Sequence, residues 1–207
     1  MNVRLVNIKS IIKRCMGRGS FMKKVLFIIG SLRKNGFNYQ LSKEAEALIK
    51  NKYDVSYLDY SNIPYMNQDI ENPVPENIGD IRKHVIESDL VFIFTPEYNY
   101  SYPGVLKNLL DWLSRPLIPN DFNSGTAVIN KKVVVTGIGG KNKTNDARNK
   151  LIDLLKFMKM DVLDYSVGFQ VNDDAWMTNK VTLADEQINE LKTLLNNVYE
   201  FLDRKNA

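Results

Sequence analysis

Cysteine and histidine are almost missing from this sequence, and their scarcity excludes several kinds of active site. The 207 residues contain one cysteine, Cys15, and one histidine, His84. A single cysteine can form neither an internal disulfide nor a multi-cysteine metal site, which is the usage expected in a reducing cytoplasm. A single histidine supports neither a multi-histidine metal site nor a histidine-based catalytic triad. We therefore predict a cytoplasmic protein without a metal site, in which His84 is a surface or packing residue.

Long apolar runs are also missing. The longest strand-like run, Val25 to Ile29, has the length of a buried strand and not the roughly 20 residues of a membrane-spanning helix. The chain is 44% hydrophobic and 25% charged, which is typical of one well-packed globular domain of this length. We expect a soluble protein with no membrane partner.

The formal net charge of +4 is unevenly distributed. Met1 to Phe21 holds five basic residues and no acidic residue, so the remainder has 23 basic and 24 acidic residues. Because the body is not basic, we expect no nucleic-acid partner. The basic segment is either a targeting or membrane-touching helix or an upstream start before a natural Met22. We favour the upstream start, with residues 1–21 a non-native or disordered extension and residues 22–207 the single domain, because Met22 leads straight into a predicted strand.

Apolar strand-like runs alternate with helical patterns from Met22 onward. The predicted strands are Lys24–Ile29, Asp54–Leu58, Asp89–Phe94, Lys132–Thr136 and a region from Val162 to Phe169. The predicted helices are Asn38–Asn51, Asn77–Glu87, Pro103–Leu113, Thr144–Met158 and Leu183–Leu202. This alternation indicates an α/β fold with a parallel sheet and helices on both faces. Five strands favour the flavodoxin-like doubly wound sheet, order 2-1-3-4-5, in which the loops after strands 1 and 3 face one ligand.

The loop after the first predicted strand, GSLRKNGFN from Gly30 to Asn38, is suited to an anion. A helix start offers unpaired backbone N–H groups and a positive dipole end, and Ser31, Arg33 and Asn38 add donors there. The alternative is a plain helix cap by Ser31 or Asn38, although Arg33 adds nothing to a cap. Gly30 and Gly36 match neither the dinucleotide fingerprint nor a Walker loop. We favour a bound phosphate.

Two further loops follow the third and fourth predicted strands. Thr95–Asn99 offers backbone groups, a tyrosine ring and an amide, which suit the edge of a flat heteroaromatic ring. The third loop, GIGGK from Gly137 to Lys141, has almost no side chains, so backbone can approach a ring closely; by itself it is equally a flexible connector. Taken together the loops describe a mononucleotide with a large flat base, and flavin mononucleotide (FMN) fits that description.

Two stretches also resemble a known family. PEYNYSYPGVLKNLLDW, residues 96–112, and GSLRK with the later FN, residues 30–34 and 37–38, resemble the NADPH-dependent FMN reductases, flavodoxin-like proteins that include azo, quinone and chromate reductases. The resemblance extends from Lys23 to the last predicted helix. One departure is Asn35-Gly36, where Gly-Ser is expected; it removes a phosphate-binding hydroxyl, so FMN binds more weakly or Asn35 compensates.

The resemblance assigns roles to particular residues. It implies that the FMN phosphate is held by Ser31, Arg33, Asn38 and the backbone around Phe37 and Tyr39. It implies that the isoalloxazine ring is lined by Pro96, Glu97, Tyr98 and Asn99, with Gly137, Gly139 and Gly140 at its other edge. Glu97 is assigned only to this loop, because a carboxylate here can equally cap a helix. No catalytic side chain is predicted, because the flavin carries the chemistry.

The activity implied is that of an FMN-dependent NAD(P)H oxidoreductase. Hydride passes from NADPH or NADH to the flavin, and then, in a ping-pong cycle, electrons pass to a small acceptor such as a quinone, an azo compound or free flavin. The resemblance also implies a homodimer or homotetramer, in which Tyr100 and Trp112 either contact a second subunit or pack in the core.

Two rival functions remain open. The first is a noncatalytic flavodoxin-type electron carrier; the Arg33 type of phosphate loop and the absence of a strongly acidic body disfavour it. The second is a relative of the fold that has lost its flavin and serves as a binding module, an interpretation that Asn35-Gly36 favours slightly.

Overall fold

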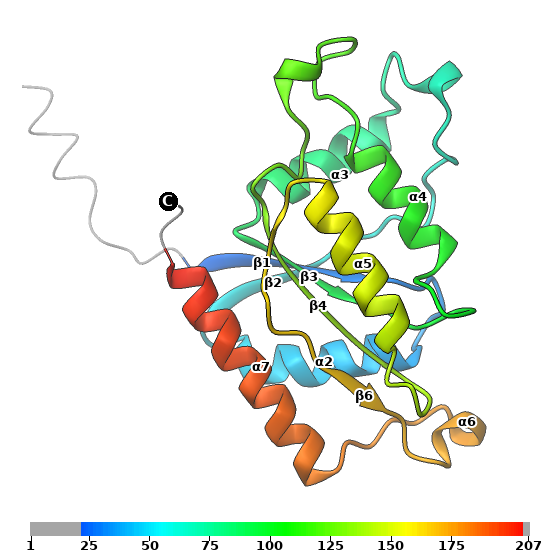
Figure 1. Cartoon of the computed structure of the whole chain (residues 1–207), viewed down its shortest axis with the longest axis vertical. Coiled ribbons are helices and arrows are strands. Elements are labelled where there is room, and N and C mark those ends of the chain that lie inside the picture. The colour runs from blue at the N-terminus through cyan, green and yellow to red at the C-terminus, as the bar shows by residue number, and fades with distance from the viewer. Residues whose placement is uncertain (1–21, 205–207) are drawn as a thin grey trace, which may run out of the picture.

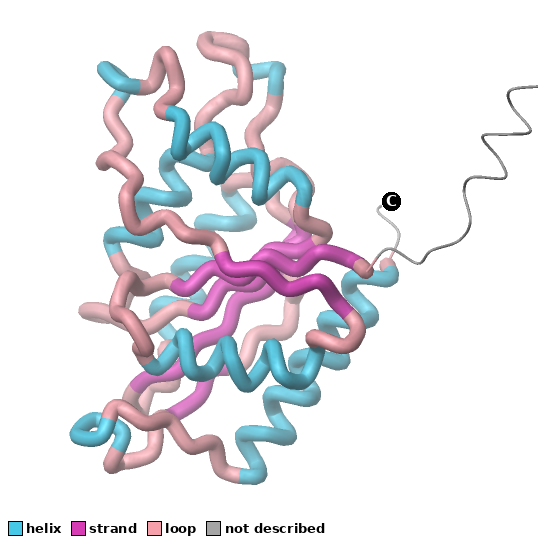
Figure 2. Tube along the Cα trace, turned by 180° about the vertical axis from the view of Figure 1, so that it is seen from behind, coloured by secondary structure: helices cyan, strands magenta, loops and turns pink. Residues whose placement is uncertain are grey.

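The computed structural model describes residues 22–204, and the prediction for residues 1–21 lies outside this range. A parallel sheet of strand order β2-β1-β3-β4-β5 lies between two layers of helices (Figures 1 and 2). The strands are β1 Lys23–Ile29, β2 Tyr53–Tyr57, β3 Leu90–Phe94, β4 Lys132–Gly139, β5 Asp161–Val162 and β6 Gly168–Gln170. The helices are α2 Phe37–Ile49, α3 Glu76–Glu87, α4 Gly104–Leu113, α5 Asn145–Phe157, α6 Ala175–Thr178 and α7 Asp185–Asp203, with 3-10 turns η1 Gln68–Ile70 and η2 Phe122–Ser124.

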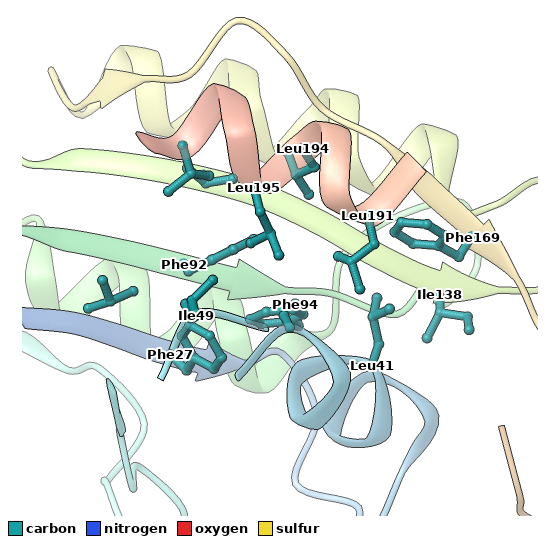
Figure 3. Packing of buried hydrophobic residues seen from close by; sticks show 14 of the residues in the cluster. Phe27, Leu41, Ile49, Phe92, Phe94, Ile138, Phe169, Leu191, Leu194 and Leu195 are labelled. Atoms are coloured by element: carbon teal, nitrogen blue, oxygen red, sulfur yellow. The ribbon is translucent and has the colours of Figure 1, made fainter. Parts of the chain in front are cut away.

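Alternating side chains of β1 explain why helices cover both faces of the sheet. Val25 and Phe27 point into a core shared with α2 and α7, whereas Leu26 and Ile28 point into a second core shared with α3, α4 and α5. Figure 3 shows the first core, in which phenylalanines of the sheet meet leucines of α2 and α7. All of β3 is buried, as expected for a central parallel strand. The predicted flavodoxin-like sheet and its strand order are therefore confirmed.

The fifth strand is the main departure from the predicted topology. The region Val162–Phe169 is not one strand, because β5 pairs with the start of β4 and β6 pairs with its end. Side chains replace the ladder between them: the Ser166 hydroxyl donates to the Val135 carbonyl at 2.8 Å, and the Thr136 hydroxyl donates to the Val167 carbonyl at 2.7 Å. Pairing with β6 also extends β4 to Gly139, three residues beyond the predicted end.

Three residues, two aromatic and one histidine, test the predictions for single positions. Trp112 is fully buried, and its indole N–H donates to the Pro64 carbonyl at 2.9 Å. It is therefore a core residue, and the alternative of a subunit contact is wrong for it. Tyr100, by contrast, is 70% exposed. His84 is exposed on α3, as predicted for a surface residue. Among the helices in residues 22–204, none is long and apolar enough to span a bilayer.

Candidate functional site

A cavity of about 600 Å³ lies where β1, β3 and β4 end. This is the edge at which doubly wound sheets bind ligands. The predicted site residues that line it are Ser31, Arg33, Phe37, Asn38, Tyr39, Pro96, Glu97, Tyr98, Asn99, Gly139 and Gly140. Gly36, Ile138 and Lys141, which lie within the predicted loops, also line it. The lining residues that sequence reasoning missed are Ile29, Tyr100, Asn142, Thr144 and Trp176. Three loops far apart in the sequence thus share one cavity.

The start of α2 presents uncapped backbone donors to this cavity. The N-cap residue is Gly36, and no side chain among the described residues caps the helix. The alternative in which Ser31 or Asn38 caps α2 is therefore wrong. The Ser31 hydroxyl instead accepts a hydrogen bond from the Arg33 backbone at 3.2 Å and lies 3.2 Å from the Tyr98 hydroxyl. Free N–H groups, a helix dipole and the Arg33 guanidinium make this end of the cavity suited to an anion.

Asn38 joins two walls of the cavity. Its side chain is only 4% exposed; the amide donates to the Ile138 carbonyl and accepts from the Ile138 N–H, both at 3.0 Å. We predicted that this side chain holds a phosphate, but it is committed to β4 instead. The contribution of Asn38 to an anion site is therefore its backbone N–H, and its amide fixes the start of α2 against the end of β4.

The departure Asn35-Gly36 has a structural consequence. Asn35 has a left-handed backbone (φ 51°), and its carbonyl accepts hydrogen bonds from the side chains of Gln40 and Asn179, both at 3.1 Å. Asn35 is outside the set of described residues that line the cavity, whereas Gly36 is within it. The role of Asn35 here is to tie the first loop to neighbouring segments.

The loop after β3 is a tight two-residue turn. Tyr98 and Ser101 exchange backbone hydrogen bonds of 2.8 and 3.0 Å across Asn99 and Tyr100, whose φ values are 50° and 59°. Two successive positive φ values define a type I′ turn, which Asn tolerates and which strains a bulky residue such as Tyr100. The Lys150 ammonium donates to the Tyr100 carbonyl at 2.6 Å, so a neighbouring helix holds the strained residue in place. The two tyrosines stand exposed at the mouth of the cavity.

Glu97 braces this turn against the third loop. One carboxylate oxygen accepts from the Asn142 amide at 2.8 Å, and the other accepts from the Ala147 backbone N–H at 3.1 Å, in the first turn of α5. The positive end of the α5 dipole also stabilises the negative charge of the Glu97 carboxylate. Glu97 therefore caps α5, a helix distant in sequence, and not the helix α4 that follows it.

The glycines after β4 have different positions from those predicted. Gly137 lies inside β4, where a Cβ atom would stand 2.1 Å from the Thr95 carbonyl oxygen; it is buried in the sheet and is not part of the cavity wall. The prediction that Gly137 borders a bound ring is therefore wrong. Gly139 and Gly140 do line the cavity. Because pairing with β6 extends β4 beyond its predicted end, Gly137 lies in the strand and not in the loop.

Thr144 lies on the cavity wall with a buried hydroxyl in need of a partner. The residue is 1% exposed, and its hydroxyl makes no hydrogen bond to any residue that the structure describes. Its φ of 56° is unusual for a β-branched residue. A buried hydroxyl without a partner carries a desolvation cost, so Thr144 is a locally unfavourable position beside the cavity.

Buried Tyr60 supports Ile29, a residue of the cavity wall. The Tyr60 hydroxyl donates to the Ile29 carbonyl at 2.5 Å, at the end of β1. Burial raises the pKa of Tyr60, and the nearby Tyr98 adds to this shift. Within residues 22–204, no group of acidic, histidine or cysteine side chains is arranged to hold a metal ion.

Comparison with known proteins agrees with this geometry. A family model described as NADPH-dependent FMN reductase matches residues 23–172. A 2-hydroxy-1,4-benzoquinone reductase from Burkholderia sp. is 39% identical over 93 residues, which span 45% of this chain but only about half (51%) of that protein. A quinone reductase from Escherichia coli K12 is 30% identical over 184 residues, 87% of this chain and 96% of that protein.

A solved structure shows the same fold over nearly the whole chain. It is the flavoenzyme NAD(P)H:(acceptor) oxidoreductase FerB from Paracoccus denitrificans. It superposes with a TM-score of 0.77 at 24% sequence identity, covering 88% of this chain and 98% of that one. The fold thus has a counterpart among solved structures, and the family model ends before Trp176.

Proposed function

Because this chain belongs to the NADPH-dependent FMN reductase family, we propose that it is an FMN-dependent NAD(P)H oxidoreductase that reduces quinones or related small acceptors. The observation that carries the proposal is the meeting of three features in one cavity: an uncapped helix start with Arg33, a rigid turn bearing Tyr98, and a strand end lined by Gly139 and Gly140. The cavity volume of about 600 Å³ lies within the range of small-ligand sites.

The residues present fit FMN. In the proposal, Arg33, Ser31 and the backbone N–H groups of Phe37, Asn38 and Tyr39 hold the phosphate. The type I′ turn from Tyr98 to Ser101 and the glycine end of β4 form the two sides between which a flat ring fits.

FMN, when bound by Arg33, Ser31 and the start of α2, would supply the hydride-accepting and electron-donating chemistry. The chain supplies binding and orientation. Glu97 has both carboxylate oxygens in structural hydrogen bonds, so it acts as a brace and we assign it no proton transfer. The mouth of the cavity, beside Tyr98 and Tyr100, is the entrance for both nicotinamide and acceptor. Because both substrates use one entrance, the nicotinamide and the acceptor bind in turn, as in a ping-pong cycle.

We infer the class of acceptor from the names of similar proteins. Proteins similar to this chain are named quinone reductase and 2-hydroxy-1,4-benzoquinone reductase, so we place quinones before azo compounds and free flavin. The donor is NADPH or NADH. The proposal includes a cytoplasmic location and a homodimer or homotetramer, for which the exposed Tyr100 beside the cavity offers a contact surface.

Steady-state kinetics test this function. The purified, FMN-loaded chain is assayed with NADPH or NADH against a benzoquinone, an azo dye and free FMN, with both substrates varied. We expect turnover with the quinone and parallel double-reciprocal lines. Intersecting lines would contradict the ping-pong order alone. Bound FMN without turnover for any donor and acceptor would contradict the enzyme and favour an electron carrier.

A further inference from the structure

The segment from Asn172 to Val181 returns to the first loop, although about 140 residues separate the two in sequence. Gln40, on α2, holds it at two points: its amide donates to the Asn179 carbonyl and accepts from the Val181 N–H, both at 2.8 Å. Short helix α6 belongs to this segment and lies on the same side of the molecule as the start of α2 (Figure 1). The family model ends at residue 172, so the family match assigns nothing to this segment.

Asn179 contacts Arg33, a charged donor at the phosphate end of the cavity. Its side-chain oxygen accepts a hydrogen bond of 2.8 Å from a terminal nitrogen of Arg33, and its side-chain nitrogen donates to the Asn35 carbonyl at 3.1 Å. Both ends of the amide are therefore used. Asn179 has a left-handed backbone, φ 54°, a conformation that asparagine adopts more readily than most residues.

Aromatic rings complete the support of Arg33. The Arg33 guanidinium lies 5.3 Å from the centre of the Phe37 ring, and the Trp176 ring packs edge-on against the same ring at 5.2 Å. Trp176 also lines the cavity. An exposed arginine ordinarily loses side-chain freedom when it binds a ligand, and supports that fix it beforehand reduce this entropic cost.

We propose that Asn179 is a positioning residue that orients Arg33 toward the phosphate of the bound flavin and thereby sets a preference for FMN over riboflavin. This inference rests on the proposed function. The hydrogen bond to Asn179 uses one of the five N–H donors of Arg33, so the others stay available for an anion. A purely structural segment, by contrast, affects FMN and riboflavin alike, because the two ligands differ only in the phosphate.

Equilibrium titrations of both flavins test the role of Asn179. FMN and riboflavin are titrated into the flavin-free full chain, with flavin fluorescence as the readout, for the wild type and for Asn179→Gly. Glycine keeps the left-handed backbone and removes only the side chain. We expect the FMN dissociation constant to rise roughly tenfold, the size of one lost charge-assisted contact, with riboflavin binding unchanged. Met177→Ala is the matched control, because Met177 is 93% exposed on α6, two residues before Asn179.

A double-mutant cycle shows whether Asn179 acts through Arg33. In the Arg33→Ala background, Asn179→Gly is expected to leave the ratio of FMN to riboflavin affinity unchanged. An equal loss for both flavins, or no loss of FMN affinity, would overturn this inference while the proposed function stands. If the wild-type chain binds no FMN at all, the proposed function fails first and this inference falls with it.

Discussion

Several polar residues at the cavity hold its walls together instead of facing the ligand. Asn38 bonds to Ile138 and Glu97 bonds to Ala147, so each links a loop to a distant element. Sequence reasoning placed both residues beside the strand ends, and both line the cavity there. It could not assign their partners, which depend on how closely β4 and α5 approach. The positions of Asn38 and Glu97 were therefore predictable from the sequence, but their hydrogen-bond partners were not.

The amide of Asn38 provides a test at this scale. We expect Asn38→Ala to lower the free energy of unfolding by about 2 kcal/mol, because the Ile138 N–H and carbonyl lose their partner in a buried place. Urea denaturation measures the change. Asn51→Ala, at an exposed position just past α2, is the control and is expected to change stability by less than about 0.5 kcal/mol. Equal stabilities of the two variants would contradict this account of Asn38.

A tyrosine at the start of β2, which packs against α7, links pH to stability. Tyr53 is 4% exposed, and its ring centre lies 5.6 Å from that of Tyr199. Burial, with smaller contributions from Asp203 and Tyr199, raises the pKa of Tyr53 to about 12. The unfolded chain loses this proton near pH 10, so the contribution of Tyr53 to stability is complete below pH 10 and is lost as pH rises toward 12.

We therefore expect wild-type stability to fall more steeply between pH 10 and 12 than that of Tyr53→Phe, by about 1 to 2 kcal/mol over the interval. Denaturant titrations at a series of pH values measure both slopes. The decline is expected to persist in part in the variant, because burial also raises the pKa of Tyr57 to about 12. Identical slopes would show that Tyr53 does not titrate as proposed; Tyr65→Phe, at an exposed position, is the control.

At the scale of elements, the close approach of β4 to β3 depends on Gly137. A Cβ atom there would lie 2.1 Å from the Thr95 carbonyl oxygen and 2.6 Å from the Thr144 hydroxyl. Backbone cannot yield as a flexible side chain can, so we expect Gly137→Ala to destabilise the chain by about 3 kcal/mol or more.

Gly79, on α3, is the matched control for that substitution. A Cβ atom at Gly79 would meet no atom within 4 Å, so Gly79→Ala is expected to stabilise the protein by about 0.5 to 1 kcal/mol through helix propensity. Chemical denaturation of the two variants distinguishes them by sign. A stable Gly137→Ala protein would contradict the tight packing of β4 on β3.

The helices α2, α3, α4, α5 and α7 were predictable to within two residues at each end, because their apolar periodicity is long and regular. The break between β5 and β6 was not predictable, because hydroxyl groups of Ser166 and Thr136 replace part of the backbone ladder there. Hydrogen bonds from side chains to the backbone leave no periodic pattern in the sequence. The same interruption, by extending β4, explains why Gly137 was misplaced.

At the scale of the whole molecule, the strand order 2-1-3-4-5 brings together the loops that follow three strands. The meeting of these loops was predictable from the sequence, because the alternation of strands and helices predicts this topology. The return of residues 172–181 to the first loop does not follow, because it depends on single hydrogen bonds such as that between Arg33 and Asn179. The loops at the strand ends were thus predictable from the fold, whereas the cavity wall that includes Trp176 was not.

The most direct test of the central claim is anaerobic addition of NADPH, or of NADH, to the purified chain after loading with FMN. We expect a yellow protein whose visible flavin absorbance bleaches on addition of a nicotinamide and returns when a benzoquinone is added. Bound flavin that neither nicotinamide bleaches would contradict the reductase function, and failure to bind FMN would contradict the assignment of the cavity itself.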